Sequence, residues 1–238
     1  MKIFKEFMPE IRDKFVLRKR FQEGAQIKLD HIIRKRNLSG KPVTWVGVHN
    51  RRGDYGHHLN ALYGLSLLSA DYFHKAMHYF SSRYDQVIFV VVTDDMEWAE
   101  DNLSLPGVEF LGHKTVLQKD TDHPLATGED VGDDLALLAA CNHTIISYGT
   151  FGQWAAMLAG GEVVISDTAA RTKEGRELRD AGFGPGDRKG WVWIEEEGTK
   201  IDETLHNGAS RKISSEIMIY LKHILIVFQC LILSEAMN

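Results

Sequence analysis

Residues 46–55 read Val-Gly-Val-His-Asn-Arg-Arg-Gly-Asp-Tyr, and the change from apolar to charged residues within them indicates an α/β fold. The apolar run over 43–49 predicts a buried strand, and Arg51 and Arg52 follow where that strand ends. In open α/β sheets, ligands bind at the carboxyl ends of the strands. Guanidinium groups bind phosphate oxygens through two parallel hydrogen bonds. The stretch therefore predicts a site for a substrate that carries a diphosphate.

Two simpler interpretations of these residues stay open. A pair of arginines after a strand is commonly a solvated turn. Arg52-Gly53-Asp54 also matches the cell-adhesion tripeptide, a short motif that often occurs by chance.

The composition indicates an ordinary globular protein of one or two domains, with 238 residues, 44% of them hydrophobic and 26% charged. A net charge of −5 argues against nucleic-acid binding. Cys141 and Cys230 are the two cysteines, so no disulfide framework is predicted. Residues 213–233 approach the length of a membrane span but contain Lys222 and His223. A buried helix, a membrane anchor and a non-native tail are equally open for this segment.

The N-terminal part predicts a long amphipathic helix over 9–36. Residues 1–36 hold eleven Lys+Arg and five Asp+Glu, a balance of +6, which favours a surface helix with a basic face over membrane binding. Residues 37–42 break the helix and are the best candidate for a domain boundary.

A second strand is predicted over 86–93, where a β-branched run indicates burial on both faces of a parallel sheet. Before it, apolar spacing predicts a helix over 70–83. A polar loop with His57 and His58 is expected after Tyr55, and no Cys or Glu-x-x-His spacing supports a metal there.

The second strand ends in Thr93-Asp94-Asp95, where two interpretations compete. Thr93 or Asp94 can cap a short following helix, which is the favoured reading. An acidic pair in this place also resembles the metal-binding motif of one large class of glycosyltransferases. A short strand over 108–111 and a polar loop to about residue 132 follow.

Residues 133–166 predict a strand–helix–strand crossover. Asp133 and Asp134 are expected to open a helix. The expected elements after it are strands over 143–147 and 162–166, a helix over 151–158 and an edge strand over 191–194.

The turn between the first of these strands and its helix holds Ser147, Gly149 and Thr150. Free amide groups and the helix dipole make such a helix start an anion site. Thr150 is also a good N-cap without any ligand, and from the residues alone that role is favoured.

Residues 46–55 resemble the first signature of the galactoside α-1,2-fucosyltransferases, the blood-group H and secretor type enzymes of glycosyltransferase family 11. Further stretches match in the same order, at 88–91 with 95–98, at 134–138, at 141–145, and at 149–152 with 154–156 and 159–161. The resemblance covers roughly 43–166 and is specific, because five motifs in order do not recur by chance.

The resemblance implies a two-domain GT-B fold and transfer of L-fucose from GDP-fucose to the 2-hydroxyl of a terminal galactose. The transfer inverts the anomeric centre and needs no metal or other cofactor. The implied partners are GDP-fucose and a galactose-terminated glycan, and the implied location is the Golgi membrane. Within this chain, the expected parts are a remnant of an acceptor-side domain (1–42), a GDP-fucose-binding α/β domain with a Rossmann-like parallel sheet (43–198) and a divergent tail (199–238).

The resemblance also assigns roles at the site. Arg51 matches the arginine that related fucosyltransferases direct at the β-phosphate, and Arg52 is expected to help neutralise the diphosphate. His49 and Asp54 would orient the arginines or the sugar, and Asp54 is the candidate base, with a salt bridge to an arginine as its alternative. The remaining expected substrate-binding residues are Ser147, Gly149, Thr150, Phe151 and Asp134.

Some features depart from the family pattern. Asn50 and Tyr148 stand where the family usually has apolar residues, and the 45 residues before Val46 are fewer than family members normally have, so a truncated acceptor domain is expected. The rival hypotheses are a relative that binds GDP-fucose or glycan without transfer, a metal-dependent glycosyltransferase built on Asp94-Asp95, and an adhesive module.

Overall fold

A six-stranded parallel sheet forms the centre of the protein, with the strand order β3-β2-β1-β4-β5-β6. The computed structural model describes residues 15–111, 128–168 and 191–194. The strands are β1 (Thr44–Asn50), β2 (Val87–Thr93), β3 (Val108–Phe110), β4 (His143–Ile146), β5 (Val163–Ser166) and β6 (Trp191–Ile194). Every predicted strand is confirmed to within a residue, and the strand order is that of a Rossmann-like domain.

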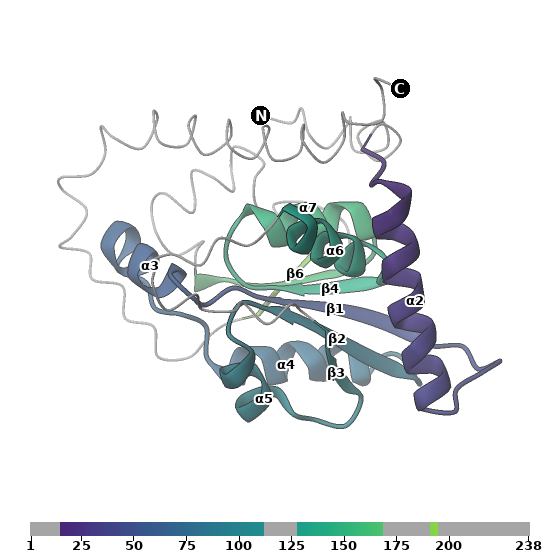
Figure 1. The fold of residues 1–238 in the computed structure, drawn as a ribbon. Coiled ribbons are helices and arrows are strands. Elements are labelled where there is room, and N and C mark those ends of the chain that lie inside the picture. Colours follow the sequence, from purple (N-terminus) through teal and green to yellow (C-terminus); the bar gives the residue numbers. More distant parts are fainter. Residues whose placement is uncertain (1–14, 112–127, 169–190, 195–238) are drawn as a thin grey trace, which may run out of the picture.

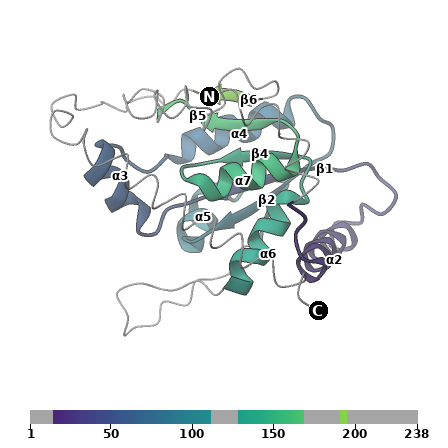
Figure 2. The ribbon, with the colours of Figure 1, turned by 90° about the horizontal axis from the view of Figure 1, so that it is seen from above.

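Helices cover both faces of this sheet (Figure 1). One layer holds α2 (Lys19–Lys35), α6 (Gly128–Ala139) and α7 (Thr150–Ala159), and the other holds α4 (Ala70–Ser81) and α5 (Met96–Leu103). The short helix α3 (Tyr55–Tyr63) lies beyond the carboxyl edge of the sheet (Figure 1, Figure 2).

The central strand β1 packs against both layers. Val46 and Val48 are fully buried in the core under α4. Gly47 faces α6, where a Cβ atom would lie 3.0 Å from Leu138 and 3.4 Å from the Cys141 sulfur. The missing side chain therefore lets α6 approach the sheet closely.

Two helix predictions need correction in the first third of the chain. The helix predicted over 9–36 is not continuous, because Arg18 has extended backbone angles (φ −54°, ψ 139°) and α2 begins at Lys19; residues 9–14 lie outside the described part of the chain. The loop predicted after Tyr55 is wrong, since residues 55–63 form α3. Leu59 is buried there, and Gly64 ends the helix in the left-handed region (φ 63°).

The predicted helix over 70–83 is confirmed as α4, and its apolar stripe is buried. The prediction that Asp133 and Asp134 open a helix is wrong, because α6 already begins at Gly128. Asp133 instead pairs with Lys28 of α2 across 3.6 Å.

The start of α7 also differs from its prediction. Gly149 is the N-cap (φ 90°, ψ 159°), and Thr150 is the first helical residue. The predicted stop is confirmed, since Gly160 closes the helix with φ 84°.

The helix α2 shares a hydrophobic core with α6 and β2. Its buried residues are Phe21, Ala25, Leu29 and Ile32, as the periodicity predicted. In the described part of the chain, no helix combines the length and the apolar character that a bilayer crossing requires. The predicted apolar tail over 213–233 lies outside the described residues.

Two glycines at the α2–α6 interface predict opposite effects of the same substitution. A Cβ at Gly132 would lie 2.4 Å from the buried Phe21 ring, whereas one at Gly24 has its nearest neighbour, in Asp133, at 3.9 Å. We expect Gly132→Ala to lower the free energy of unfolding by about 1–3 kcal/mol through overpacking. Gly24→Ala should raise it by up to about 1 kcal/mol, because alanine is the better helix former.

Urea denaturation of both variants measures these free energies. Equal effects of the two substitutions would contradict the close packing of Phe21 on Gly132.

Candidate functional site

The strand order reverses between β1 and β4, which is where α/β sheets bind ligands. The chain moves outward from β1 through β2 to β3, and then returns to the other side of β1 with β4. The carboxyl ends of β1 and β4 are joined by two hydrogen bonds. The Ser147 amide donates to the His49 carbonyl (3.0 Å), and the Arg51 amide donates to Ser147 Oγ (2.9 Å). The structure thus brings together two of the sequence motifs that were predicted to form one site.

The Arg51 side chain lies at the open side of this edge and is 37% exposed. Its Nη1 group donates to Asp94 Oδ2, and its Nη2 group donates to Asp54 Oδ1. The guanidinium carbon is 5.9 Å from the centre of the Tyr55 ring. Within the described residues these two contacts leave other N–H groups of Arg51 for a ligand.

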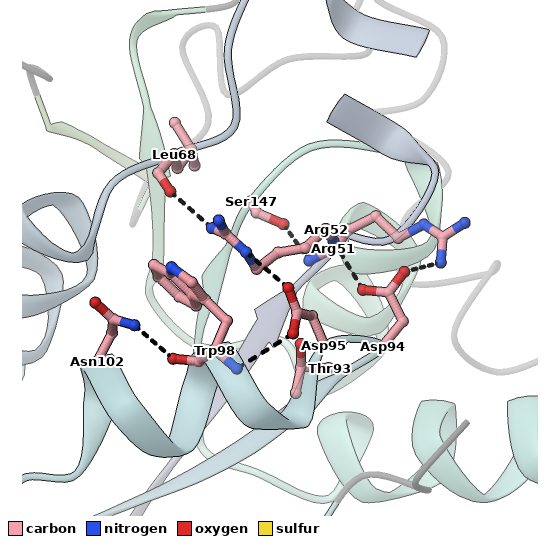
Figure 3. Close-up of polar contacts among 9 residues, drawn as sticks. All are labelled: Arg51, Arg52, Leu68, Thr93, Asp94, Asp95, Trp98, Asn102 and Ser147. Atoms are coloured by element: carbon pink, nitrogen blue, oxygen red, sulfur yellow. Dashed lines mark hydrogen bonds and ion pairs between the residues drawn. The ribbon is translucent and has the colours of Figure 1, made fainter. Parts of the chain in front are cut away.

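The neighbouring Arg52 is turned into the protein and its side chain is 13% exposed. Its guanidinium carbon lies 3.5 Å from the centre of the Trp98 ring, Nη1 donates to the Leu68 carbonyl (3.1 Å), and Nε is 3.4 Å from Asp95 Oδ2. Figure 3 shows the two guanidinium groups pointing in opposite directions. Burial lowers the pKa of Arg52, and the Asp95 carboxylate opposes that change.

The adjacent carboxylates Asp94 and Asp95 contact different partners. Asp94 Oδ1 accepts from the Arg52 amide (2.7 Å) while Oδ2 accepts from Arg51. Asp95 caps α5 by accepting from the Trp98 amide (3.2 Å), so the prediction of Thr93 or Asp94 as the cap is wrong. Thr93 Oγ1 instead accepts from the Asp95 amide (3.0 Å).

His49 is buried beneath the first turn of α7 and is 6% exposed. A Cβ at Gly152 would lie 2.5 Å from His49 Nδ1, so the glycine gives the imidazole its space. The Phe151 ring centre lies 5.3 Å from that of His49. Burial, with the positive charge of Arg51, lowers the pKa of His49 from 6.5 to about 3. Its Nδ1 has no hydrogen-bond partner among the described residues.

The start of α7 completes the edge. Gly149 adopts a left-handed φ, and a Cβ there would lie 3.5 Å from the Tyr55 hydroxyl. Tyr55 is therefore close to both Arg51 and the α7 turn. The first amides of a helix lack intrahelical acceptors, so they can bind an anion. Thr150 and Phe151 belong to this first turn.

The remaining predicted residues belong to α6 and α3. Asp134 lies in the middle of α6 rather than at a helix start. His57 and His58 belong to α3, and the described residues contain no group of three or more His, Cys, Asp or Glu side chains placed to hold a metal ion.

The sequence did not predict three contacts of the site. Asp94 connects the Arg51 side chain to the Arg52 amide, and the Trp98 ring packs against the Arg52 guanidinium. The Tyr148 hydroxyl donates to the Ser66 carbonyl (3.2 Å). Asn50 and Tyr148, which depart from the family pattern, are both buried. The acidic pair after β2 could have indicated the Asp94 contact, but nothing in the sequence showed which of the two carboxylates faces Arg51.

Comparison with known proteins identifies the family of this chain. Residues 1–195 match the model described as glycosyl transferase family 11. The chain belongs to this family. The resemblance found in the sequence motifs is thereby confirmed.

Curated relatives carry the same family's enzyme names. Galactoside alpha-(1,2)-fucosyltransferase 2 of Mus musculus is 37% identical over 158 residues, which are 66% of this chain and 41% of the relative. Galactoside alpha-(1,2)-fucosyltransferase 1 of Homo sapiens is 37% identical over 163 residues, covering 68% of this chain and 41% of the relative. The chain thus spans about 41% of the length of these relatives. No solved structure matches the chain.

The buried His49 predicts a pH dependence of stability. Its folded pKa of about 3 lies below its ordinary 6.5, so the unfolded state takes up the proton first on acidification. The contribution of the neutral His49 to the free energy of unfolding is therefore complete above pH 6.5. It is lost as the pH falls from 6.5 towards 3, because the unfolded state binds the proton more readily. We expect His49→Gln to reduce the acid-side slope of the unfolding free energy by up to about 1.4 kcal/mol per pH unit.

Urea denaturation of wild type and variant between pH 7 and pH 4.5 measures this slope. If the free energy of unfolding changed with pH by the same slope in both proteins, the neutral, buried state of the His49 imidazole would be contradicted.

Proposed function

We propose that this protein binds GDP-fucose at the carboxyl edge of its sheet and transfers L-fucose to the 2-hydroxyl of a terminal galactose. The proposal rests on the position of Arg51. Its guanidinium group is partly exposed at the point where the strand order reverses, next to the start of α7. The names of the curated relatives supply the reaction.

The chemistry requires stabilisation of a leaving diphosphate. Negative charge grows on the β-phosphate as the sugar departs, and preorganised donors are the usual means of stabilising it. Arg51 would bind that phosphate with the N–H groups that Asp94 leaves free, including the Nη2 group that contacts Asp54 before the ligand binds. The α7 turn, with Ser147, Gly149, Thr150 and Phe151, would hold the rest of the nucleotide from the β4 side. In this proposal Arg52 supports the loop from within, Asp134 is a further substrate-binding residue, and His49 orients the arginines or the sugar.

The reaction also requires a proton acceptor for the attacking hydroxyl. Asp54 is the proposed base. Its side chain is 65% exposed, and its contact to Arg51 is one that a phosphate would replace. Binding of the donor would then release Asp54 for the acceptor.

The described part corresponds in this proposal to the donor half of a GT-B enzyme, since its sheet has the Rossmann strand order. The galactose-terminated acceptor and the Golgi location rest on the family membership and stay predictions. A relative that binds GDP-fucose without transfer is the second candidate. Donor binding without turnover on any β-galactoside would favour it. The adhesive reading would require an accessible Arg52, whose side chain is 13% exposed.

Replacing Arg51 tests the proposed phosphate contact. We expect Arg51→Ala to weaken GDP binding at least ~10-fold and to abolish fucose transfer, because hydrogen bonds to charged groups contribute about 1.5–3 kcal/mol each. Isothermal titration with GDP and a transfer assay with a β-galactoside acceptor measure the two effects.

Arg83→Ala is the matched control. It removes the same charge from an exposed position just after α4, at the amino edge of the sheet. Wild-type GDP affinity in Arg51→Ala would refute the proposed function.

The acidic pair predicts the response to chelation. Asp94 and Asp95 both face arginines, so their charges are already balanced without a cation. We therefore expect GDP affinity and transfer to be the same in EDTA as in buffer with manganese. Activity that disappears with EDTA and returns with manganese would support the metal-dependent alternative.

A further inference from the structure

The Asp94 carboxylate is fixed from three directions. Its backbone follows the buried end of β2, where Thr93 is 5% exposed. Oδ1 accepts from the Arg52 amide at 2.7 Å, and the side chain is 18% exposed. A Cβ at Gly53 would lie 2.5 Å from Oδ2, so the carboxylate packs against the backbone of the arginine loop. These contacts hold the carboxylate so that Oδ2 accepts a hydrogen bond from Arg51.

The second carboxylate on Arg51 is held much less firmly. Asp54 is 65% exposed, and although it stands at the N-cap of α3, its side chain makes no capping hydrogen bond. Asp54 can move away when a ligand arrives, whereas Asp94 cannot move without breaking the Arg52 contact. The orientation of the Arg51 guanidinium therefore depends on Asp94.

The contacts of Arg52 strengthen the same support. Its guanidinium, between Trp98, Asp95 and the Leu68 carbonyl, anchors the loop whose amide binds Asp94 (Figure 3). Asp94 thus joins the end of β2 to the loop after β1, and Arg52 joins the same loop to the start of α5. A flexible arginine side chain loses conformational entropy when it binds a ligand, which weakens binding. Because these contacts already order the Arg51 side chain before the ligand binds, less entropy is lost in the binding step.

We propose that Asp94 is a positioning residue for the nucleotide diphosphate: it holds the Arg51 guanidinium in its binding orientation before the ligand arrives. The inference rests on the proposed function, since it assumes that Arg51 binds the phosphate. Asp94 itself touches no substrate and acts through Arg51.

Asp94→Asn tests this role with little change in shape. The amide oxygen can still accept from the Arg52 amide, but the NH₂ group replaces Oδ2 and opposes the Arg51 donor. We expect GDP affinity in isothermal titration to fall about 10-fold, as for the loss of roughly one hydrogen bond to a charged group. Asp101→Asn is the control, because it removes the same charge from an exposed position on α5. It should leave GDP affinity near wild type.

Gly53→Ala provides a second variant that keeps the Asp94 charge. The added methyl group would displace Oδ2, so GDP affinity should fall in the same direction even if Asp94→Asn fails to fold. Wild-type or improved GDP affinity in either folded variant would overturn the inference.

A double-mutant cycle with Arg51→Ala distinguishes positioning from general structural support. If Asp94 acts through Arg51, Asp94→Asn has no further effect on GDP affinity in the Arg51→Ala background. An equal loss in both backgrounds would overturn the inference while the proposed function stands. Unchanged GDP affinity in Arg51→Ala alone would instead refute the proposed function, so the two failures give different results.

Discussion

The parallel pairing of β1 with β4 is the constraint on which the site depends. Val48 lies opposite Ile145 and His49 opposite Ile146, and this register places Ser147 beside the Arg51 amide. A slip by one residue would turn His49 to the opposite face and remove the Ser147 contact, because side chains alternate along a strand. The fully buried Val46, Val48 and Ile145 make that slip costly, so the geometry of the polar edge is set by the apolar core beneath it.

Orientation rather than excess charge makes this edge suitable for an anion. The two arginines face three carboxylates, Asp54, Asp94 and Asp95, so the cluster carries a net charge of −1. A diphosphate would therefore not be attracted by charge alone. What favours it is a guanidinium with donors left over, beside helix amides that also lack acceptors. In the proposed reaction such a site would distinguish ligands by geometry, because it has to bind the departing diphosphate more tightly than the intact donor.

The sequence predicted the sheet well because parallel strands are continuous apolar runs, as in 87–93, and such runs have few alternative structures. It predicted less where neighbouring residues are chemically equivalent. Asp94 and Asp95 can each cap a helix, and the choice falls on Asp95 because Arg51 and the Arg52 amide bind Asp94. The α3 helix was missed because its amphipathic pattern is short and its stability comes from packing of Leu59. The opposite directions of Arg51 and Arg52 depend on Trp98, which lies more than forty residues away in sequence.

The two edges of the sheet satisfy their polar groups differently, and this difference supports the placement of the site. At the amino edge, Glu162 accepts from Tyr79 (2.7 Å) and Tyr84 (2.6 Å), and its amide donates to His143 Nδ1 (3.0 Å). Burial raises the pKa of Glu162, but the hydrogen bonds from Tyr79 and Tyr84, together with the charges of His143 and Arg83, lower it below its ordinary value. Buried side-chain atoms without a hydrogen-bond partner among the described residues occur towards both edges: His49 Nδ1, Asn50 Nδ2 and Arg52 Nε towards the carboxyl edge, and Thr144 Oγ1 towards the amino edge. These atoms alone therefore do not distinguish the two edges. The distinction lies in the charged groups, because the Glu162 carboxylate at the amino edge is bound by two tyrosines, whereas Arg51 at the carboxyl edge keeps N–H groups that a ligand would complete.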